Sequence, residues 1–353
     1  MSASLGDGSV RAASPGNRAQ DRAGNRATAP TGPHGGDAIA VARSRGIDPT
    51  QLLDLSASLN PYAPPIDRFV DRVNLGTYPD DTAATAALSA AIGIDPERLV
   101  LTNGGAEAIA LVAALEPVGD VQSPEFALYE RHLAEVRPGS PRWRSNPSNP
   151  LGELAPAAAV ARVWDEAFWP LATGTWTRGD GSWRIGSLTK LWACPGARIG
   201  YAIAPDTATA QRLRDRRPRW SVNAVALMLI EALLPVTDLP TWSSAIAAQR
   251  QRLVQVLAER GLAVRNTAAN WVLVEAFDLR AKLIEHDVLV RDCASFGMHG
   301  TYRIAVPDDG GLQRLVAALD AVVEPVDHGA AGDHDSVGPP DAPAVTDTTE
   351  RRR

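Results

Sequence analysis

Cysteine is scarce in this sequence, since only Cys194 and Cys293 occur among its 353 residues. Two thiols are too few for a disulfide framework and lack the paired spacing of a zinc site, so we expect no metal centre and a reducing, cytoplasmic setting. No apolar run approaches membrane-spanning length, and a formal net charge of −6 offers no basic field to nucleic-acid phosphates. A soluble protein that binds neither membrane nor nucleic acid is therefore expected.

Both ends of the chain lack large apolar side chains. Ordering residues 1–33 would cost backbone entropy without burying anything in return, so we expect a disordered N-terminal tail. Residues 327–353 are polar and rich in Gly, Pro and Asp, which predicts a second disordered tail.

Between the tails, apolar strands alternate with helical patterns, which favours an α/β domain with a mainly parallel sheet. The strands expected there span residues 98–102, 160–164, 183–187 and 199–203, with a helix at 106–115. Beyond Pro205 the pattern changes and predicts a smaller α+β domain. Its expected elements are a long helix near 243–260, stopped by Gly261, strands at 271–274, 288–290 and 302–306, and a helix at 312–323.

One segment combines a hydroxyl, a lysine and an arginine at fixed spacing. Ser187 stands three residues before Lys190, and Arg198 stands eight residues after it. A lysine attacks an aldehyde only when neutral, and nearby positive charge lowers its pKa, which Arg198 could supply while gripping a phosphate through its planar donors. The alternative is an ordinary surface Lys and Arg beside a strand.

This segment resembles the S-x-[ST]-K and G-x-R-x-G motifs of fold-type-I pyridoxal-phosphate enzymes, the class I/II aminotransferase family. The branch it resembles contains threonine-phosphate decarboxylase and histidinol-phosphate aminotransferase. The resemblance covers about residues 34–325 and implies pyridoxal 5'-phosphate as cofactor. It implies that Lys190 forms the Schiff base and that Ser187 and Arg198 bind the cofactor phosphate.

The same resemblance sets the expected domains. Residues 34–65 would contribute to the small domain and the substrate site, 66–205 would form the large cofactor-binding domain, and 206–326 would form the small C-terminal domain. Only 16 residues separate Tyr129 from Asn146, and a similarly short stretch joins Gly152 to Asp165. Family members usually have a complete strand and helix in these places, so we expect a shortened large domain whose sheet lacks an element or has an unusual edge.

Two polar residues are expected against the cofactor ring. Asp165 ends an apolar strand, and the resemblance places its carboxylate on the pyridine nitrogen, where it keeps the ring protonated as an electron sink. Asn149 lies in a segment similar to N-P-x-N-P-x-G, whose second Asn binds the phenolic oxygen. Many relatives have Tyr where this chain has Phe168, so a phenol hydrogen bond to that oxygen is expected to be missing. Alone, such an Asp is commonly a helix cap and such an Asn-Pro pair a turn.

Further motifs are assigned to the phosphate, the ring face and the partner subunit. Gly105 and Ala106 follow a strand and open a helix whose N–H groups suit a phosphate, although many such turns bind nothing. Phe126 would stack on the pyridine face, where ordinary core packing is the alternative. Tyr78, in Gly76-Thr-Tyr78-Pro-Asp80, would reach the phosphate of a neighbouring subunit, which implies a homodimer.

Three residues are assigned to a small-molecule substrate. His34, in a His-Gly-Gly entry, and Asn60 resemble the threonine-phosphate decarboxylase group, and Arg303 resembles the arginine that clamps the substrate carboxylate. Arg291-Asp-Cys293 matches a small-domain motif of the same branch.

Lys190 and Asp165 are thus the expected catalytic pair, and the reaction depends on which Cα bond stands perpendicular to the ring. Loss of the carboxylate gives a decarboxylase, and loss of the proton gives an aminotransferase. The His34-Gly-Gly entry and the Ser-Leu-Thr-Lys form favour threonine-phosphate decarboxylation in cobalamin biosynthesis. One alternative is a histidinol-phosphate aminotransferase of histidine biosynthesis. Another is a non-catalytic cofactor-binding scaffold, although a scaffold would not need the electron sink that Asp165 supports.

Overall fold

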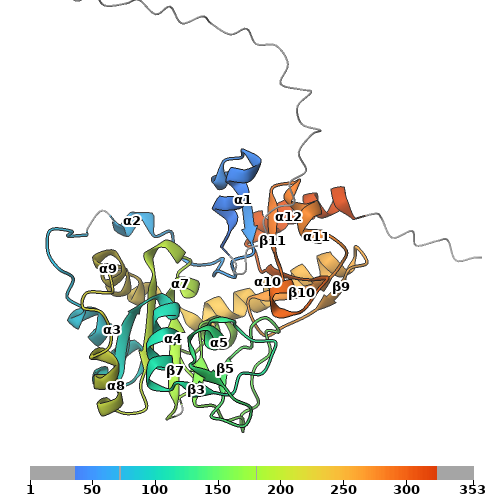
Figure 1. The fold of residues 1–353 in the computed structure, drawn as a ribbon. Coiled ribbons are helices and arrows are strands. Elements are labelled where there is room, and N and C mark those ends of the chain that lie inside the picture. Colours follow the sequence, from blue (N-terminus) through green and yellow to red (C-terminus); the bar gives the residue numbers. More distant parts are fainter. Residues whose placement is uncertain (1–35, 71–72, 180, 324–353) are drawn as a thin grey trace, which may run out of the picture.

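The structure is a computed structural model that describes residues 36–70, 73–179 and 181–323. Both predicted tails and His34 lie outside the described residues. The described chain forms two units, each built on a five-stranded sheet, and the long helix α10 (Leu239–Ala258) runs from one to the other (Figure 1).

The first sheet confirms the mainly parallel arrangement that was predicted. Four of its strands run in one direction, and β8 alone runs against both of its neighbours. Its order is β2 (Leu99–Asn103), β8 (Ile199–Ile203), β7 (Trp183–Ser187), β6 (Val163–Asp165) and β5 (Trp143–Ser145). Strand β5 was not predicted, because its three residues include an arginine and are too few to show an alternating pattern.

Helices cover both faces of this sheet, as the alternation of side chains along a strand requires. Leu99 and Leu101 of β2 pack in one core, and Val100 between them packs in the opposite one. The first core includes α3 (Thr82–Ile92), α7 (Leu188–Leu191) and α9 (Ala224–Leu233); the second includes α4 (Gly104–Leu115), α5 (Leu128–His132) and α8 (Thr207–Arg214). Two short helices, α2 (Asp67–Val70) and α6 (Trp169–Thr173), also lie in this unit.

The predicted domain boundary at residue 206 lies too early. Helices α8 and α9 follow the last strand of the first sheet, and both bury their apolar side chains against that sheet. The chain changes unit along α10, where Ile246 belongs to the first core and Leu253 and Leu257 to the second. Asp238 caps the start of α10 by accepting a hydrogen bond from Thr241 N at 3.1 Å.

The second unit is the expected α+β arrangement. Strand β1 pairs in parallel with β11, and the other pairs are antiparallel. The order is β1 (Leu53–Leu55), β11 (Val288–Asp292), β12 (Thr301–Ala305), β10 (Trp271–Glu275) and β9 (Ala263–Arg265), with α11 (Leu279–Ile284) and α12 (Asp309–Val322) packed on it. The N-terminal α1 (Ala38–Arg45) packs Val41 and Ala42 against Ile284 and Leu289 of this unit.

The shortened segments keep their strands and lack helices. Strands β3 (Val118–Gly119) and β4 (Glu135–Val136) form a separate pair, linked toward β5 by a single bridge between Asp120 and Arg142. The connections at 137–142 and 146–162 contain no helix. The β3–β4 pair is thus attached to the sheet only through this bridge, and the connections on either side of β5 contain no helix.

Cations cover part of the face that lacks a helix. Arg144, Trp164 and Arg184 are cross-strand neighbours on β5, β6 and β7. The guanidinium carbons of Arg144 and Arg178 lie 5.6 and 4.3 Å from the centre of the Trp164 ring. Arg178 also donates to the carbonyls of residues 157 and 159, which holds the loop above. Cation–π contacts thus take the place of apolar helix packing.

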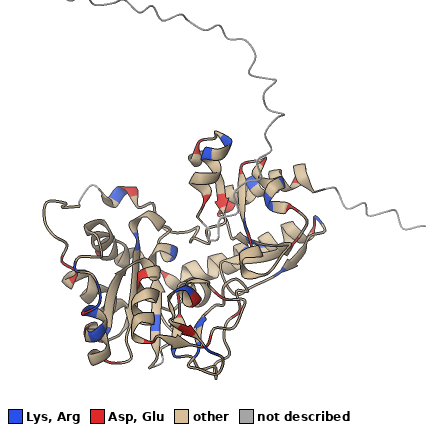
Figure 2. Ribbon diagram, in the orientation of Figure 1, with Lys and Arg blue, Asp and Glu red and all other residues tan. Residues whose placement is uncertain are grey.

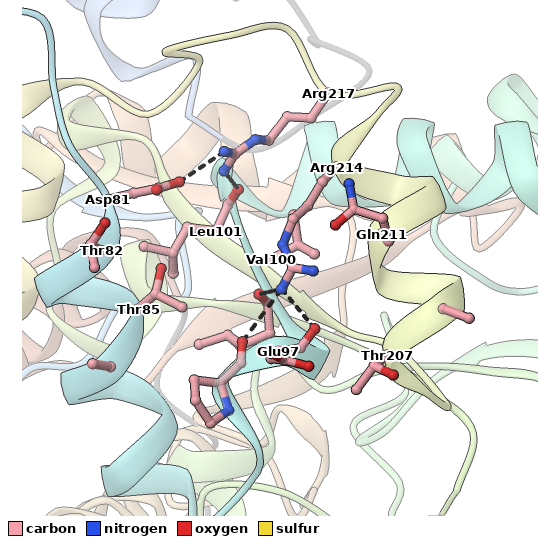
Figure 3. A pocket seen from close by; sticks show the side chains of 14 residues that line it. Asp81, Thr82, Thr85, Glu97, Val100, Leu101, Thr207, Gln211, Arg214 and Arg217 are labelled. Atoms are coloured by element: carbon pink, nitrogen blue, oxygen red, sulfur yellow. Dashed lines mark hydrogen bonds and ion pairs between the residues drawn. The ribbon is translucent and has the colours of Figure 1, made fainter.

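Arginines also occupy the outer edge of β2. Arg214 donates to Leu99 O at 3.1 Å, and Arg217 donates to Leu101 O at 2.7 Å and to the Asp81 carboxylate at 2.8 Å (Figure 3). They line a cavity of about 750 Å³ that contains none of the predicted site residues. Because guanidinium groups already donate to these backbone carbonyls, the outer edge of β2 cannot pair with another strand.

Basic and acidic positions are interspersed over both units (Figure 2). Within the described residues, no single helix is long and apolar enough to cross a membrane. Only Ala224–Val236 taken together with α10, across an 83° bend, reaches that length and composition.

Gly200 is predicted to be irreplaceable at the contact between β8 and α4. A Cβ atom there would lie 2.6 Å from Gly105 N, in rigid backbone. We expect Gly200→Ala to lower the free energy of unfolding by about 3 kcal/mol, measured by urea denaturation. Gly196→Ala is the matched control, since a Cβ at Gly196 meets nothing within 4 Å. Equal stability of the two variants would contradict the packing described.

Candidate active site

Lys190 lies on α7, which begins directly after β7 ends. Burial, reinforced by the positive charges of Arg303 and Arg198, lowers the pKa of its ε-amine to about 8. Asp54 and Asp165 oppose this shift only in part. A neutral amine is the nucleophilic form, so this environment prepares Lys190 to attack an aldehyde near neutral pH.

Asp165 is the last residue of β6, and its side chain is buried. Its carboxylate accepts hydrogen bonds from the Tyr129 hydroxyl at 2.8 Å and from Ala167 N at 3.0 Å. Burial raises the pKa of Asp165, while these hydrogen bonds and the charge of Lys190 oppose the rise. Lys190 and Asp165 are close enough for the charge of each to affect the pKa of the other, and their pairing in catalysis stays a prediction.

The predicted phosphate ligands converge at the start of α4. Gly104 has a φ of +76°, and a Cβ added there would lie 2.5 Å from Arg198 Nη2. A Cβ on Gly105 would lie 3.6 Å from Ser187 Cβ, and the Ser187 and Thr189 hydroxyls are 2.6 Å apart. Gly105, Ala106, Ser187 and Arg198 are therefore brought together, with backbone N–H donors of a twelve-residue helix. Sequence reasoning missed Gly104, the position where the guanidinium leaves no room for a side chain.

Asn149 and Arg303 come together across the two units. Arg303 Nη1 donates to Asn149 Oδ1 at 2.6 Å, and its Nη2 donates to Ser56 O at 3.3 Å. The guanidinium carbon lies 5.0 Å from the centre of the Trp271 ring, and Arg303 Nε has no hydrogen-bond partner among the described residues. Arg303 thus links Asn149 to the segment around Ser56, and its Nε–H remains available to a further group.

The two phenylalanines of the site differ in their surroundings. Phe126 is half-buried and meets Tyr129 edge-on, with ring centres 5.9 Å apart. Phe168 is buried against Trp271, with ring centres 4.7 Å apart in a small apolar cluster between the units. Phe168 therefore packs against the second unit. As a phenylalanine, it cannot donate the phenol hydrogen bond that a tyrosine at this position would supply.

Asn60 is tied to its own chain by several hydrogen bonds, and its role toward a substrate stays a prediction. Its Nδ2 donates to Leu191 O at 2.9 Å, its Oδ1 accepts from Tyr62 N at 3.0 Å, and its own N donates to Lys190 O at 3.0 Å. These bonds attach the segment around Asn60 to α7, so Asn60 helps to position Lys190. Its hydrogen-bonding role was invisible in the sequence because Leu191 is distant along the chain.

Tyr78 stands apart from this cleft. Its ring is 76% exposed and stacks on Trp220, with ring centres 4.4 Å apart. Its role in the site of a neighbouring subunit stays a prediction.

Glu125 was missed by sequence reasoning. Its carboxylate accepts from Ser145 N and Phe126 N, each at 3.0 Å, and from Ser145 Oγ. Ser145 Oγ also accepts from Asn149 N at 2.7 Å. Burial, with Asp165 nearby, raises the pKa of Glu125 although these hydrogen bonds lower it. Glu125 therefore connects the Phe126 segment to the Asn149 loop, and a single acid after a proline gave no signal of this.

Arg291 was recognised in a motif but given no role. It lies directly opposite Arg303 in the β11–β12 register, so the two side chains share one face of the sheet. Arg291 is buried, donates to Ser295 Oγ at 2.8 Å, and has a pKa lowered chiefly by burial.

The residues fit pyridoxal phosphate by their chemistry. At the start of α4, Gly104 has a φ of +76° and lies against the Arg198 guanidinium, whose N–H donors suit a phosphate. Asp165 offers a buried carboxylate to a ring nitrogen, and Lys190 offers an amine to an aldehyde. Asn149 can reach a phenolic oxygen with the amide nitrogen that its bond to Arg303 leaves available.

Comparisons with known proteins agree with this geometry. Residues 130–319 match the model of the family "Aminotransferase class I and II". Threonine-phosphate decarboxylase of Salmonella typhimurium is 30% identical over 82% of this chain and 96% of its own length. The histidinol-phosphate aminotransferase structure from Clostridium acetobutylicum has a TM-score of 0.66 at 23% identity, over 77% of this chain and 99% of that one. The Sinorhizobium meliloti enzyme in complex with pyridoxal-5'-phosphate has a TM-score of 0.66 at 20% identity, over 81% and 94%.

The pKa of Lys190 predicts the pH dependence of cofactor capture by apo-protein. The rate should rise about tenfold per pH unit and level off above about pH 8, because only the neutral amine reacts, whereas an ordinary lysine would level off near 10.5. Visible absorbance after mixing with pyridoxal phosphate measures it. The chain has only two lysines, so Lys282→Arg should leave the profile unchanged and Lys190→Arg should abolish the signal. A rate that still climbs at pH 10 would refute the lowered pKa.

Proposed function

Because this chain belongs to the class I and II aminotransferase family, whose members use pyridoxal phosphate, we propose that it is an L-threonine O-3-phosphate decarboxylase. The observation that carries the proposal is the pair of buried arginines, Arg291 and Arg303, facing the same side of adjacent strands. A phosphorylated amino acid brings a carboxylate and a phosphate in one molecule, which is one anion for each guanidinium.

The electrostatics of the pair support a doubly anionic substrate. Burial lowers the pKa of Arg303 to about 10, and the neighbouring charge of Arg291 lowers it further while Cys293 opposes the change. A bound anion stabilises a buried guanidinium whose pKa is lowered, as it is for both arginines. Histidinol phosphate carries a phosphate and no carboxylate, so it matches the pair less well.

The chain's own residues account for binding and orientation. When bound, the cofactor supplies an electron sink for the bond broken at Cα. Asp165 keeps the ring nitrogen protonated, and Tyr129 fixes the direction of that carboxylate. Arg291 and Arg303 hold the two ends of the substrate and so set the rotation about Cα. Lys190, neutral near pH 8, accepts or returns a proton at Cα.

A homodimer completes this proposal. The exposed ring of Tyr78 would reach the cofactor phosphate in a second copy of the chain, supplementing the cradle formed by Gly104 and Arg198. Leu75 in the same loop is 77% exposed, which suits burial against that copy. Two free, buried cysteines fit the proposed cytoplasmic setting.

An assay with two substrates tests the reaction. Purified protein loaded with pyridoxal phosphate should release carbon dioxide from L-threonine O-3-phosphate without any oxo-acid. Histidinol-phosphate transamination is the second candidate, since the structurally similar protein from Clostridium acetobutylicum is a histidinol-phosphate aminotransferase. Turnover of histidinol phosphate that depends on 2-oxoglutarate, with no carbon dioxide from threonine phosphate, would reject the decarboxylase assignment.

Arg291 is predicted to select for the doubly charged substrate. Arg291→Gln should raise KM for L-threonine O-3-phosphate about a hundredfold, because one charge-assisted contact is lost. The cofactor dissociation constant should stay unchanged. Arg45→Gln, which removes only the exposed ion pair with Glu285, is the control and should leave KM as it was. An unchanged KM in Arg291→Gln would contradict the assignment.

A further inference from the structure

Tyr78 and Trp220 form an exposed aromatic pair outside the cleft. Their rings are 76% and 52% exposed, stack with centres 4.4 Å apart, and are inclined by 25°. They come from loops far apart in the sequence, and Arg217 joins the same loops through its 2.8 Å ion pair with Asp81. Stacking leaves Tyr78 with one preferred direction although solvent surrounds it.

The backbone of Trp220 is strained and firmly anchored. Its φ of +58° lies in the left-handed region, which bulky side chains rarely adopt. Arg217 before it donates to Leu101 O at 2.7 Å, and Ser221 after it donates to Glu107 Oε2 at 3.1 Å. Asn223 donates to Ala197 O at 3.0 Å, beside Arg198. Contacts on both sides therefore keep this loop in a conformation that projects the indole toward Tyr78.

We propose that Trp220 is a positioning residue that holds Tyr78 in the orientation with which it completes the cofactor site of the partner subunit. The inference rests on the homodimer proposed above. A tyrosine on a free loop would lose side-chain and backbone entropy on entering the partner's site, and stacking removes part of that loss beforehand. Trp220 thus acts through Tyr78 and has no contact with the cofactor itself.

A glycine at position 220 separates this role from a structural one. Glycine adopts positive φ without strain, so Trp220→Gly should unfold at the same temperature as wild type or higher. Its cofactor dissociation constant should nevertheless rise about tenfold, measured by visible absorbance on reconstituting apo-protein. Trp220→Phe, which retains a stacking ring, should bind close to wild type. Phe277→Ala, which removes an 86% exposed ring elsewhere, should change nothing.

A double variant tests whether the effect passes through Tyr78. In the Tyr78→Ala background, Trp220→Gly should add no further loss of affinity, because the ring that it positions is gone. Additive losses, or wild-type affinity in Trp220→Gly, would overturn the proposal. If Trp220→Gly lowers the unfolding temperature together with affinity, and Trp220→Phe does the same, the residue is structural and the proposal fails.

Hybrid dimers test whether Trp220 acts on the partner. Mixing Trp220→Gly with Lys190→Ala chains yields hybrids in which Lys190 of one chain and Trp220 of the other serve the same site. About half of the Lys190-bearing sites should then regain wild-type cofactor affinity. If Trp220 served its own subunit, none would. The readout is cofactor binding, so failure of the decarboxylase assignment leaves it interpretable, and a monomer in sedimentation would overturn the dimer and this inference together.

Discussion

The candidate site depends on the proximity of three cationic side chains, namely the half-buried Lys190, the exposed Arg198 and the buried Arg303. Their mutual repulsion, added to burial, is what lowers the pKa of Lys190 to about 8 and leaves its amine reactive. The same repulsion makes the cleft receptive to anions, so one electrostatic constraint prepares both the nucleophile and the binding sites. Asp165 balances the cluster only partly, because its own carboxylate is buried.

Two units must meet for this cluster to exist. Lys190 and Arg198 come from the first unit, and Arg303 comes from the second. The connections that hold the units together include α10, the Phe168–Trp271 contact, and the bond from Asn60 to Leu191 O. The bond from Arg303 to Asn149 then joins the proposed substrate clamp to the residue proposed for the cofactor oxygen. Small shifts between the units would therefore alter both.

Much of the fold and of the site could be predicted from sequence, because strands and their following loops carry dense local motifs. Ser187, Lys190 and Arg198 are close along the chain, and their convergence follows from one strand–helix–strand turn. Contacts between distant residues could not be predicted. The bond between Asn60 and Leu191 joins residues 131 positions apart, so no local motif could indicate it. The packing of α8 on the first unit likewise gives no local signal.

The connections on either side of β5 contain no helix, and the proposed site residues near them are held by strands and strand-end loops instead. The proposed site residues of this unit stand on strands, on the loops that follow them, or at the start of α4, and all these strands are kept. Arg144, Trp164 and Arg184 lie on the opposite side of β6 from Asp165, where guanidinium groups contact the Trp164 ring. Neighbouring residues on a strand point to opposite faces of the sheet. The Trp164 ring therefore packs against guanidinium groups on one face, and Asp165 lies on the other. Alternation along one strand thus separates a variable face from the face that carries the proposed chemistry.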